Sequence, residues 1–181
     1  MAMLMCSSKE VKLYFYLNYK RNQFNSINVV KELLDICCNY KYQIFIDKFG
    51  KPRTNRSNLH FNISHSNNMM LVGISDDDLG VDIEFERELD EITVEAFKNR
   101  SESISNRDHP ISLWTVKEAV MKYIGKGLVI EPLDVKIKNS KEVQVHNTVF
   151  NYQTQTLFEQ YHFSVVMKGE FIIESIEIII L

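Results

Sequence analysis

Several stretches of the chain are rich in β-branched and aromatic residues, which predicts β-strands. In Gly80–Glu86 hydrophobic and polar residues also alternate with a period of two, which predicts a strand with one buried face. We expect a strand at Val11–Tyr19, and another from Tyr42 that runs into a turn at Gly50–Pro52. Residues 60–75 contain two β-rich runs about a Ser-Asn-Asn turn, which predicts a hairpin. The remaining β-rich stretches are a strand at 80–86 and hairpin-like units at 132–147 and 162–180, the last ending in a buried strand.

Residues 25–40 have the period of an amphipathic helix instead. The face that we expect to be buried carries Val29, Leu33, Ile36 and Cys37. A short second helix is expected around Thr93–Asn99, in the polar stretch that follows the strand at 80–86.

The strongest helical pattern covers residues 111–127. We expect Ser112 to be its N-cap, and Gly125 and Gly127 to end it. Trp114, Glu118 and Lys122 are spaced by four residues and share one face. The opposite, core-facing stripe carries Leu113, Val116, Val120, Tyr123 and Ile124. The Gly-Lys-Gly sequence follows the helix rather than preceding it, so it lacks the context of a phosphate-binding P-loop.

The chain has 181 residues, 45% of them hydrophobic, which suffices for one large domain or two small lobes. A net charge of −3 gives no basic field, so we expect neither nucleic acid nor a membrane as partner. Cys6, Cys37 and Cys38 have no metal-ligand spacing and no disulfide framework. The N-terminus lacks a signal-peptide pattern, and the apolar C-terminal end is too short to span a bilayer. We therefore expect a soluble, cytoplasmic protein.

A weak internal similarity relates residues 60–84 to residues 162–178, and a helix precedes each of the two regions. This arrangement fits two similar α+β lobes packed side by side. A cleft between such lobes is the expected place for a ligand site.

The segment Gly80–Glu86 places Asp82, Glu84 and Glu86 on one side of a strand. Like charges repel each other as neighbours on one face, so this face is either solvated or shares a cation. If the helix at 111–127 packs across it, Asp82, Glu84, Glu118 and Lys122 converge. Three carboxylates suit Mg²⁺, and a lysine beside them can neutralise phosphate oxygens. The alternative for Glu118 and Lys122 is an ordinary surface ion pair.

Two short motifs add weaker candidates. Lys51 lies in the Gly-Lys-Pro turn, where it either reaches a phosphate or is solvated. Ser64 and His65 place a hydroxyl and an imidazole on one arm of the expected hairpin. The other histidines have no ligand spacing and are interpreted as structural or surface residues: His60, His109, His146 and His162.

Four motifs in this order resemble the 4′-phosphopantetheinyl transferases, specifically the surfactin-synthetase-activating (Sfp-like) type. They are FGKP at Phe49–Pro52, FNISHS at Phe61–Ser66, GVDIE at Gly80–Glu84 and WTVKEAVMKYIGKGL at Trp114–Leu128. The resemblance implies a single α+β domain over residues 1–181. It further implies two pseudo-symmetric α/β lobes, approximately 1–104 and 105–181, with the active site in the cleft between them.

The resemblance also implies an activity and its partners. The phosphopantetheine group of coenzyme A would be transferred to a serine hydroxyl of an apo acyl or peptidyl carrier protein, releasing 3′,5′-ADP. The enzyme would be a cytoplasmic monomer that requires Mg²⁺, with coenzyme A as co-substrate.

By motif match, Asp82, Glu84 and Glu118 would hold Mg²⁺, and Lys122 would contact the pyrophosphate. Catalysis would rest on Glu118 as the base for the incoming serine, directly or through a metal-bound water, together with Lys122 and Asp82. The other expected contacts to coenzyme A are Lys51 and Pro52 near the adenosine, and Ser64 and His65 near the ribose 3′-phosphate.

The family's basic residues upstream of Gly-Lys-Pro have Lys20 and Arg21 as their nearest candidates here. Glu86 is outside the family metal set, and we expect it to be exposed or outer-shell. Phe97 either contacts a carrier helix or packs in the core of the short helix.

Two other functions are compatible with the residues. One is a protein of the same fold that binds coenzyme A or a carrier without turnover. The other is a Mg²⁺-dependent phosphohydrolase, because carboxylates with a lysine also serve that chemistry.

Overall fold

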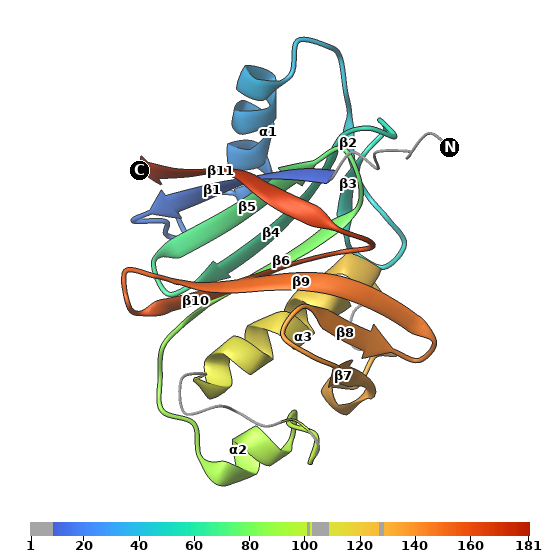
Figure 1. Cartoon of the computed structure of the whole chain (residues 1–181). Helices are drawn as coiled ribbons and strands as arrows, with labels where there is room; N and C mark the ends of the chain where they lie inside the picture. Colours follow the sequence, from blue (N-terminus) through green and yellow to red (C-terminus); the bar gives the residue numbers. More distant parts are fainter. Residues whose placement is uncertain (1–8, 101, 103–108, 127–128) are drawn as a thin grey trace, which may run out of the picture.

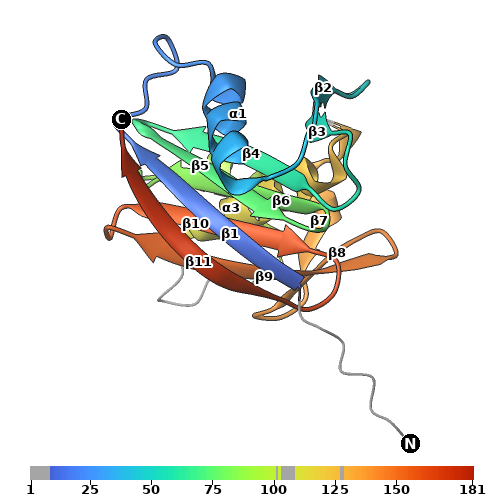
Figure 2. The ribbon, with the colours of Figure 1, turned by 90° about the horizontal axis from the view of Figure 1, so that it is seen from above.

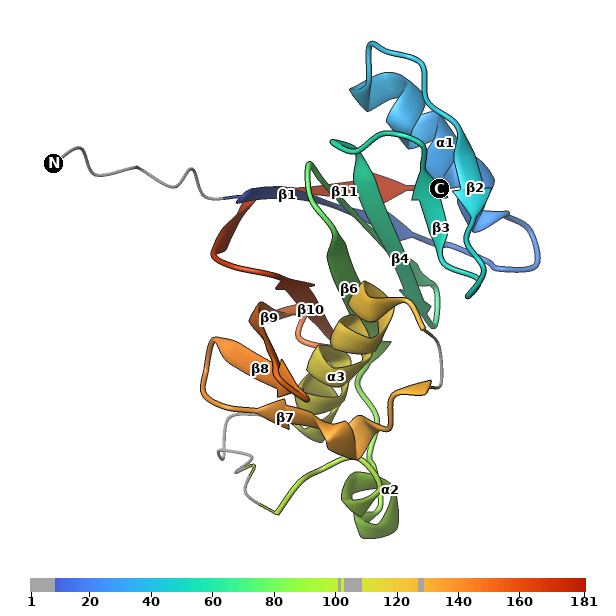
Figure 3. The same cartoon turned by 90° about the vertical axis from the view of Figure 1, so that its right-hand side faces the viewer.

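The structure, a computed structural model, describes residues 9–100, 102, 109–126 and 129–181. Cys6 and Gly127 lie outside the described residues. The described chain forms four layers in the order α1 (Ser26–Cys37), a four-stranded sheet, a five-stranded sheet and α3 (Pro110–Ile124) (Figure 1). Viewed from the side, the two long helices lie at opposite ends of this stack (Figure 3).

The four-stranded sheet has the order β11-β1-β5-β4. Its strands are β1 (Lys9–Leu17), β4 (His60–Ser66), β5 (Met69–Ser75) and β11 (Phe171–Ile180). β1 pairs with β5 in antiparallel fashion and with β11 in parallel, so the first and last strands of the chain lie side by side (Figure 2).

The five-stranded sheet has the order β6-β10-β9-β8-β7. Its strands are β6 (Leu79–Phe85), β7 (Val135–Ile137), β8 (Glu142–Val145), β9 (Thr148–Leu157) and β10 (Tyr161–Met167). The short strands β2 (Ile44–Ile46) and β3 (Pro52–Thr54) form a separate hairpin. The short helices are α2 (Glu91–Glu95) and a 3₁₀ turn at Pro132–Asp134.

The two large sheets exchange strands. The hairpin β4–β5 is followed by β6, which joins the other sheet beside β10. The hairpin β9–β10 is followed by β11, which joins the first sheet beside β1. Each half thus contributes a helix, a hairpin and a crossing strand, and the predicted α+β class is confirmed. The division into lobes near residue 104 stays a prediction.

Three apolar clusters hold these layers together. One lies between the two sheets and includes Phe15 and Phe163, whose rings meet edge to face at 5.0 Å. The second lies between α1 and the four-stranded sheet, and the third lies between α3 and the five-stranded sheet. None of the helices in the described ranges has the length and hydrophobicity to span a membrane.

The predicted strand at Val11–Tyr19 and the hairpin at 60–75 are confirmed. The prediction of which face of α1 is buried was partly wrong. Ile36 is 84% exposed and Cys37 is also exposed. The buried side chains are Val29, Val30, Leu33 and Leu34. This face repeats at i, i+1, i+4 and i+5, and Ile36 lies outside it near the helix end.

The start of α3 also differs from the prediction. Its N-cap is His109, whose Nδ1 accepts a hydrogen bond from Ile111 N at 3.2 Å. Pro110 occupies the first helical position, where its fixed φ suits the turn and no N–H is needed. The predicted end is confirmed at Gly125, which has a left-handed φ of 69°. In the predicted core-facing stripe, Val116 and Val120 are buried, and Leu113, Tyr123 and Ile124 are only partly buried.

The C-terminal prediction was wrong in two respects. Residues 162–180 do not pair as a hairpin, because β10 lies between β6 and β9, and β11 joins the other sheet. β11 is an edge strand rather than a buried one, with Ile172, Ile176 and Ile178 each more than 40% exposed. β9 was not predicted, although it supplies the true hairpin partner of β10.

Candidate active site

α3 lies directly on the acidic face of β6, and Gly80 makes this close approach possible. A Cβ atom at Gly80 would lie 1.9 Å from Ala119 O and 2.6 Å from Tyr123 N, both backbone atoms of α3. Only a residue without a side chain allows the two backbones to come so close. The contact brings Glu118 and Lys122 of α3 over the carboxylates of β6.

Hydrogen bonds to β10 fix α3 along its length. Ser112 Oγ lies 2.8 Å from His162 Nδ1, and Thr115 Oγ1 lies 2.7 Å from Ser164 Oγ. Ser164 is opposite Asp82 in the β6–β10 register. The hydroxyl side chains of α3 therefore satisfy polar groups of the sheet and set the position of the helix relative to Asp82.

Side chains of β4 bridge the edges of the two sheets. Asn62, Ser64 and Ser66 alternate along β4 and point to one side. Their side-chain oxygens accept hydrogen bonds from the backbone N–H groups of Val81 at 3.0 Å, Ile83 at 3.2 Å and Phe85 at 3.0 Å, in that order. The polar side chains thus replace the backbone pairing that β4 and β6 do not make.

The two serines of this bridge also hold the carboxylates. Ser64 Oγ donates to Asp82 Oδ1 at 2.7 Å, and Ser66 Oγ donates to Glu84 Oε2 at 2.8 Å. Lys122 Nζ lies 2.6 Å from both Ser64 Oγ and Asp82 Oδ1. The carboxylate of Asp82 on β6, the hydroxyl of Ser64 on β4 and the ammonium of Lys122 on α3 therefore lie within hydrogen-bond distance of one another.

The carboxylate of Asp82 is shielded from water, whereas Glu84 and Glu118 are partly exposed. Asp82 is 2% exposed, which rules out a solvated outer face at this position. Burial raises the pKa of its carboxyl, while the charge of Lys122 acts in the opposite direction. Burial also raises the pKa of Glu118, and the charge of Asp82 raises it further. The charge of Asp82 is thus compensated by Lys122 rather than by solvent.

This donor set fits a divalent cation. Asp82 Oδ2 is buried and has no hydrogen-bond partner among the described residues, so one carboxylate oxygen is free to bind an ion. Glu84 and Glu118 supply the other carboxylates, as hard cations prefer. Within the described ranges, no three His, Cys, Asp or Glu side chains already form a metal-binding group. The ammonium of Lys122 lies against Asp82 Oδ1 instead.

A cavity of about 710 Å³ opens beside the cluster. It extends from Trp114 and Glu118 of α3 to the β2–β3 turn and the first residues of α1. All the site residues predicted from the sequence line it: Lys51, Pro52, Ser64, His65, Asp82, Glu84, Glu118 and Lys122. The structure therefore brings the predicted set together around one space, and the role of each residue stays a prediction.

Several of these residues make contacts that the sequence did not predict. Lys51 is buried, and its ammonium donates to Tyr123 O at 2.9 Å at the end of α3. Burial lowers the pKa of Lys51 to about 8. The ring of His65 stacks on Tyr19 at 6.2 Å. Lys20 is exposed and does not line the cavity, and the same holds for Arg21.

The short segment between β6 and α3 is attached by buried contacts. Phe97 is 3% exposed and its ring lies 5.2 Å from that of Trp114, which favours the core-packing interpretation of Phe97. Lys117 and Glu102 form a buried ion pair at 3.0 Å. Glu86 is partly exposed and bonds to His162 Nε2 at 3.1 Å, away from the Asp82 cluster.

The structural roles of Asn62 and Ser66 were not predicted from the sequence. A signal was present, because polar residues alternate at positions 62, 64 and 66 of the hairpin. It also missed the apolar part of the cavity wall, formed by Ile27, Ile46, Phe49 and Met121.

Comparison with known proteins identifies the family. The model of the 4′-phosphopantetheinyl transferase superfamily matches residues 78–174, which is more than half of the chain. The chain belongs to this superfamily. The match begins just before β6 and ends in β11, so it includes the acidic strand and all of α3.

Curated relatives carry the same name. The chain is 33% identical to 4′-phosphopantetheinyl transferase gsp of Aneurinibacillus migulanus over 138 residues, which is 68% of this chain and 58% of the relative. It is 34% identical to 4′-phosphopantetheinyl transferase ffp of Bacillus subtilis over 96 residues, 48% of this chain and 42% of the relative. It is 27% identical to 4′-phosphopantetheinyl transferase psf-1 of Bacillus pumilus over 145 residues, which is 72% of this chain and 62% of the relative. The matches thus span about half of each relative's length.

Proposed function

We propose that this protein transfers the 4′-phosphopantetheine group of coenzyme A to a serine hydroxyl of an apo acyl or peptidyl carrier protein, in a Mg²⁺-dependent reaction. The serine oxygen bonds to the phosphorus that carries the pantetheine. The bond from that phosphorus to the leaving phosphate breaks, and 3′,5′-ADP is released. The proton of the serine passes to a carboxylate of the enzyme.

The observation that carries the proposal is the buried, unpartnered oxygen of Asp82 at the wall of the cavity, in a chain of this superfamily. Burying a carboxylate without a partner costs free energy, so such an oxygen favours a cationic ligand. Asp82, Glu84 and Glu118 would hold Mg²⁺, which would supply positive charge to the pyrophosphate oxygens and the leaving group.

The residues around the cavity take separate roles in this proposal. Lys122 is held by Asp82 and Ser64, so its charge is oriented before a phosphate arrives. Glu118 is half-buried at the wall of the cavity, where its carboxylate would accept the proton of the serine. The β2–β3 turn, with Lys51 and Pro52, would form the wall for the adenosine end of the donor.

The test is intact-mass spectrometry of apo carrier proteins incubated with the protein, coenzyme A and Mg²⁺, beside an EDTA control. We expect a mass gain of one phosphopantetheine group that is absent with EDTA. No gain on any carrier despite measurable binding of coenzyme A would point to a binding protein instead. Consumption of coenzyme A without a carrier, with release of free phosphopantetheine, would point to a phosphohydrolase.

Glu118→Gln tests the proposed base. The amide keeps the size of the side chain but accepts no proton at neutral pH, so kcat should fall on the order of 10²-fold. The far-ultraviolet circular dichroism spectrum should be unchanged. Steady-state transfer to a carrier measures the effect, and a loss of only two-fold would rule out a central role for Glu118.

A further inference from the structure

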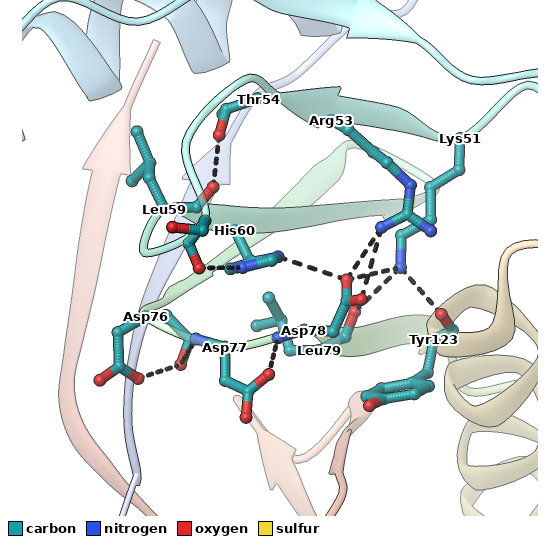
Figure 4. Close-up of polar contacts among 12 residues, drawn as sticks. Lys51, Arg53, Thr54, Leu59, His60, Asp76, Asp77, Asp78, Leu79 and Tyr123 are labelled. Atoms are coloured by element: carbon teal, nitrogen blue, oxygen red, sulfur yellow. Dashed lines mark hydrogen bonds and ion pairs between the residues drawn. The ribbon is translucent and has the colours of Figure 1, made fainter.

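Asp78 is the last of three consecutive aspartates and lies directly before β6. Three basic side chains surround its carboxylate (Figure 4). Asp78 Oδ1 lies 3.0 Å from Arg53 Nη1, 3.4 Å from His60 Nδ1 and 3.6 Å from Lys51 Nζ. The hydrogen bond with His60 and the charges of the two other cations hold the pKa of Asp78 well below its usual range.

Two of these cations belong to the β2–β3 hairpin, which forms one wall of the cavity. Ile46, Phe49 and Pro52 of this hairpin line the cavity. Asp47 holds the turn, since its Oδ1 accepts from Phe49 N at 2.9 Å. Its Oδ2 accepts from Arg53 Nε at 2.8 Å. Arg53 therefore connects the turn of the hairpin to Asp78 and so to β6.

Lys51 connects the same turn to α3. Its ammonium donates to Tyr123 O at 2.9 Å, in the last turn of the helix. Its stem passes close to the helix end, because a Cβ at Gly125 would lie 2.7 Å from Lys51 Cδ. Asp78 thus attracts Arg53 and Lys51. These two side chains link the hairpin to β6, which carries Asp82, and to α3, which carries Glu118.

The base of the hairpin is attached to the rest of the chain. Thr54 Oγ1 donates to Leu59 O at 2.5 Å, and Ile44 packs against the α1 cluster. β2 and β3 nevertheless join neither large sheet, and Phe45, Ile46 and Phe49 towards the turn are each about half exposed. A hairpin this small is marginal by itself, so the charge contacts of Arg53 and Lys51 help to hold its turn in place.

We propose that Asp78 is a positioning residue for the phosphopantetheine donor, holding the β2–β3 wall at a fixed place relative to β6 and α3. The inference rests on the proposed function for the identity of the donor. Asp78 does not line the cavity among the described residues, so it acts through Arg53 and Lys51 rather than by contact with the donor. The Asp82 cluster is held separately by Ser64 and Ser66.

Asp78→Asn tests this role. Without the carboxylate charge, Arg53 and Lys51 repel each other. The link from the hairpin to β6 is then reduced to the hydrogen bond from Lys51 Nζ to Leu79 O at 3.5 Å. We expect KM for coenzyme A and the calorimetric Kd for coenzyme A to rise on the order of ten-fold. kcat and KM for the carrier should stay within two-fold, because the groups around Asp82 keep their own hydrogen bonds.

Asp76→Asn is the matched control. It makes the same chemical change two residues earlier, where the carboxylate contacts the hydroxyl of Ser75 and has no ion pair with Arg53, His60 or Lys51. Its kinetic constants should equal those of the wild type. A second variant, Arg53→Gln, should raise KM for coenzyme A, and the Asp78→Asn, Arg53→Gln double variant should show less than the product of the two single effects.

The outcomes separate positioning from general stability. Equal rises in both KM values, or an unchanged KM for coenzyme A, would overturn the positioning role. If the wild type transfers no phosphopantetheine but binds coenzyme A, the proposed activity fails, and the Kd values of the wild type and Asp78→Asn still decide the role of Asp78. A wild type that binds no coenzyme A overturns both proposals.

Discussion

Asp82→Asn is expected to lower the rate of phosphopantetheine transfer by about 10³-fold or more while the protein remains folded. The amide keeps the shape of the side chain and can still bond to Ser64. It removes the charge on the one buried oxygen that has no partner in the described structure, and with it the central ligand of the proposed ion. Loss of a single charge-stabilising group in an active site typically costs 10²–10³-fold, and loss of an ion costs more.

The stability of the Asp82→Asn variant should separate the contribution of metal binding from the contribution of the side chain to the fold. Burial raises the pKa of Asp82, so the folded state retains its proton to higher pH than the unfolded chain does. The stabilising contribution of this group is therefore complete below its unfolded pKa and is lost as the pH rises through the folded pKa. At neutral pH the burial of the ionised carboxylate costs free energy, and its ion pair with Lys122 offsets part of this cost. The neutral amide carries neither effect.

Urea unfolding with and without Mg²⁺ measures this difference. Without Mg²⁺ the variant should be within about 1 kcal/mol of the wild type, since the lost ion pair with Lys122 offsets the gain. An ion at 100 times its Kd stabilises the wild type by about 2.7 kcal/mol, and the variant should lose this response. Glu86→Gln, one residue beyond the same strand, is the control and should keep both activity and the Mg²⁺ response. An active Asp82→Asn would mean that the metal assignment is wrong.

The sequence was sufficient to predict several local elements and the residues that gather around the cavity. Two β-rich runs about a turn located β4 and β5, and alternation with a period of two located β6. The spacing of Trp114, Glu118 and Lys122 placed them on one face of α3, and all three line the cavity. These predictions depend only on residues that are close in the sequence and lie in the same helix or strand, so the sequence contains the information they need.

The errors came from contacts between distant parts of the chain. Consecutive strands usually pair, so residues 162–180 were expected to form a hairpin. β11 instead crosses to β1, about 160 residues earlier, and nothing in its own sequence identifies that partner. The bridge from Ser64 and Ser66 to β6 depends on the same strand exchange. The linking role of Asp78 likewise follows only once the β2–β3 hairpin lies beside β6 and α3.

Gly80 is the residue at which a minimal substitution should have the largest effect on the fold and the site together. In Gly80→Ala, the added Cβ would overlap Ala119 O and Tyr123 N. These atoms belong to the backbone of α3, so no side-chain rotation can relieve the overlap and the helix must move away from β6. We expect a loss of about 3 kcal/mol in the free energy of unfolding. Transfer should fall at least ten-fold even well below Tm, because Glu118 and Lys122 move away from Asp82.

Gly169→Ala is the matched control for this change. Gly169 has a φ of 77°, and a Cβ there would meet no atom within 4 Å, so the substitution adds only left-handed backbone strain of about 1 kcal/mol. Urea unfolding and steady-state transfer at one temperature compare the two variants. Equal stability and activity in both would show that α3 does not need its close contact with β6. A Gly80→Ala protein that is folded but inactive would show that the distance between this helix and this strand sets the geometry of the site.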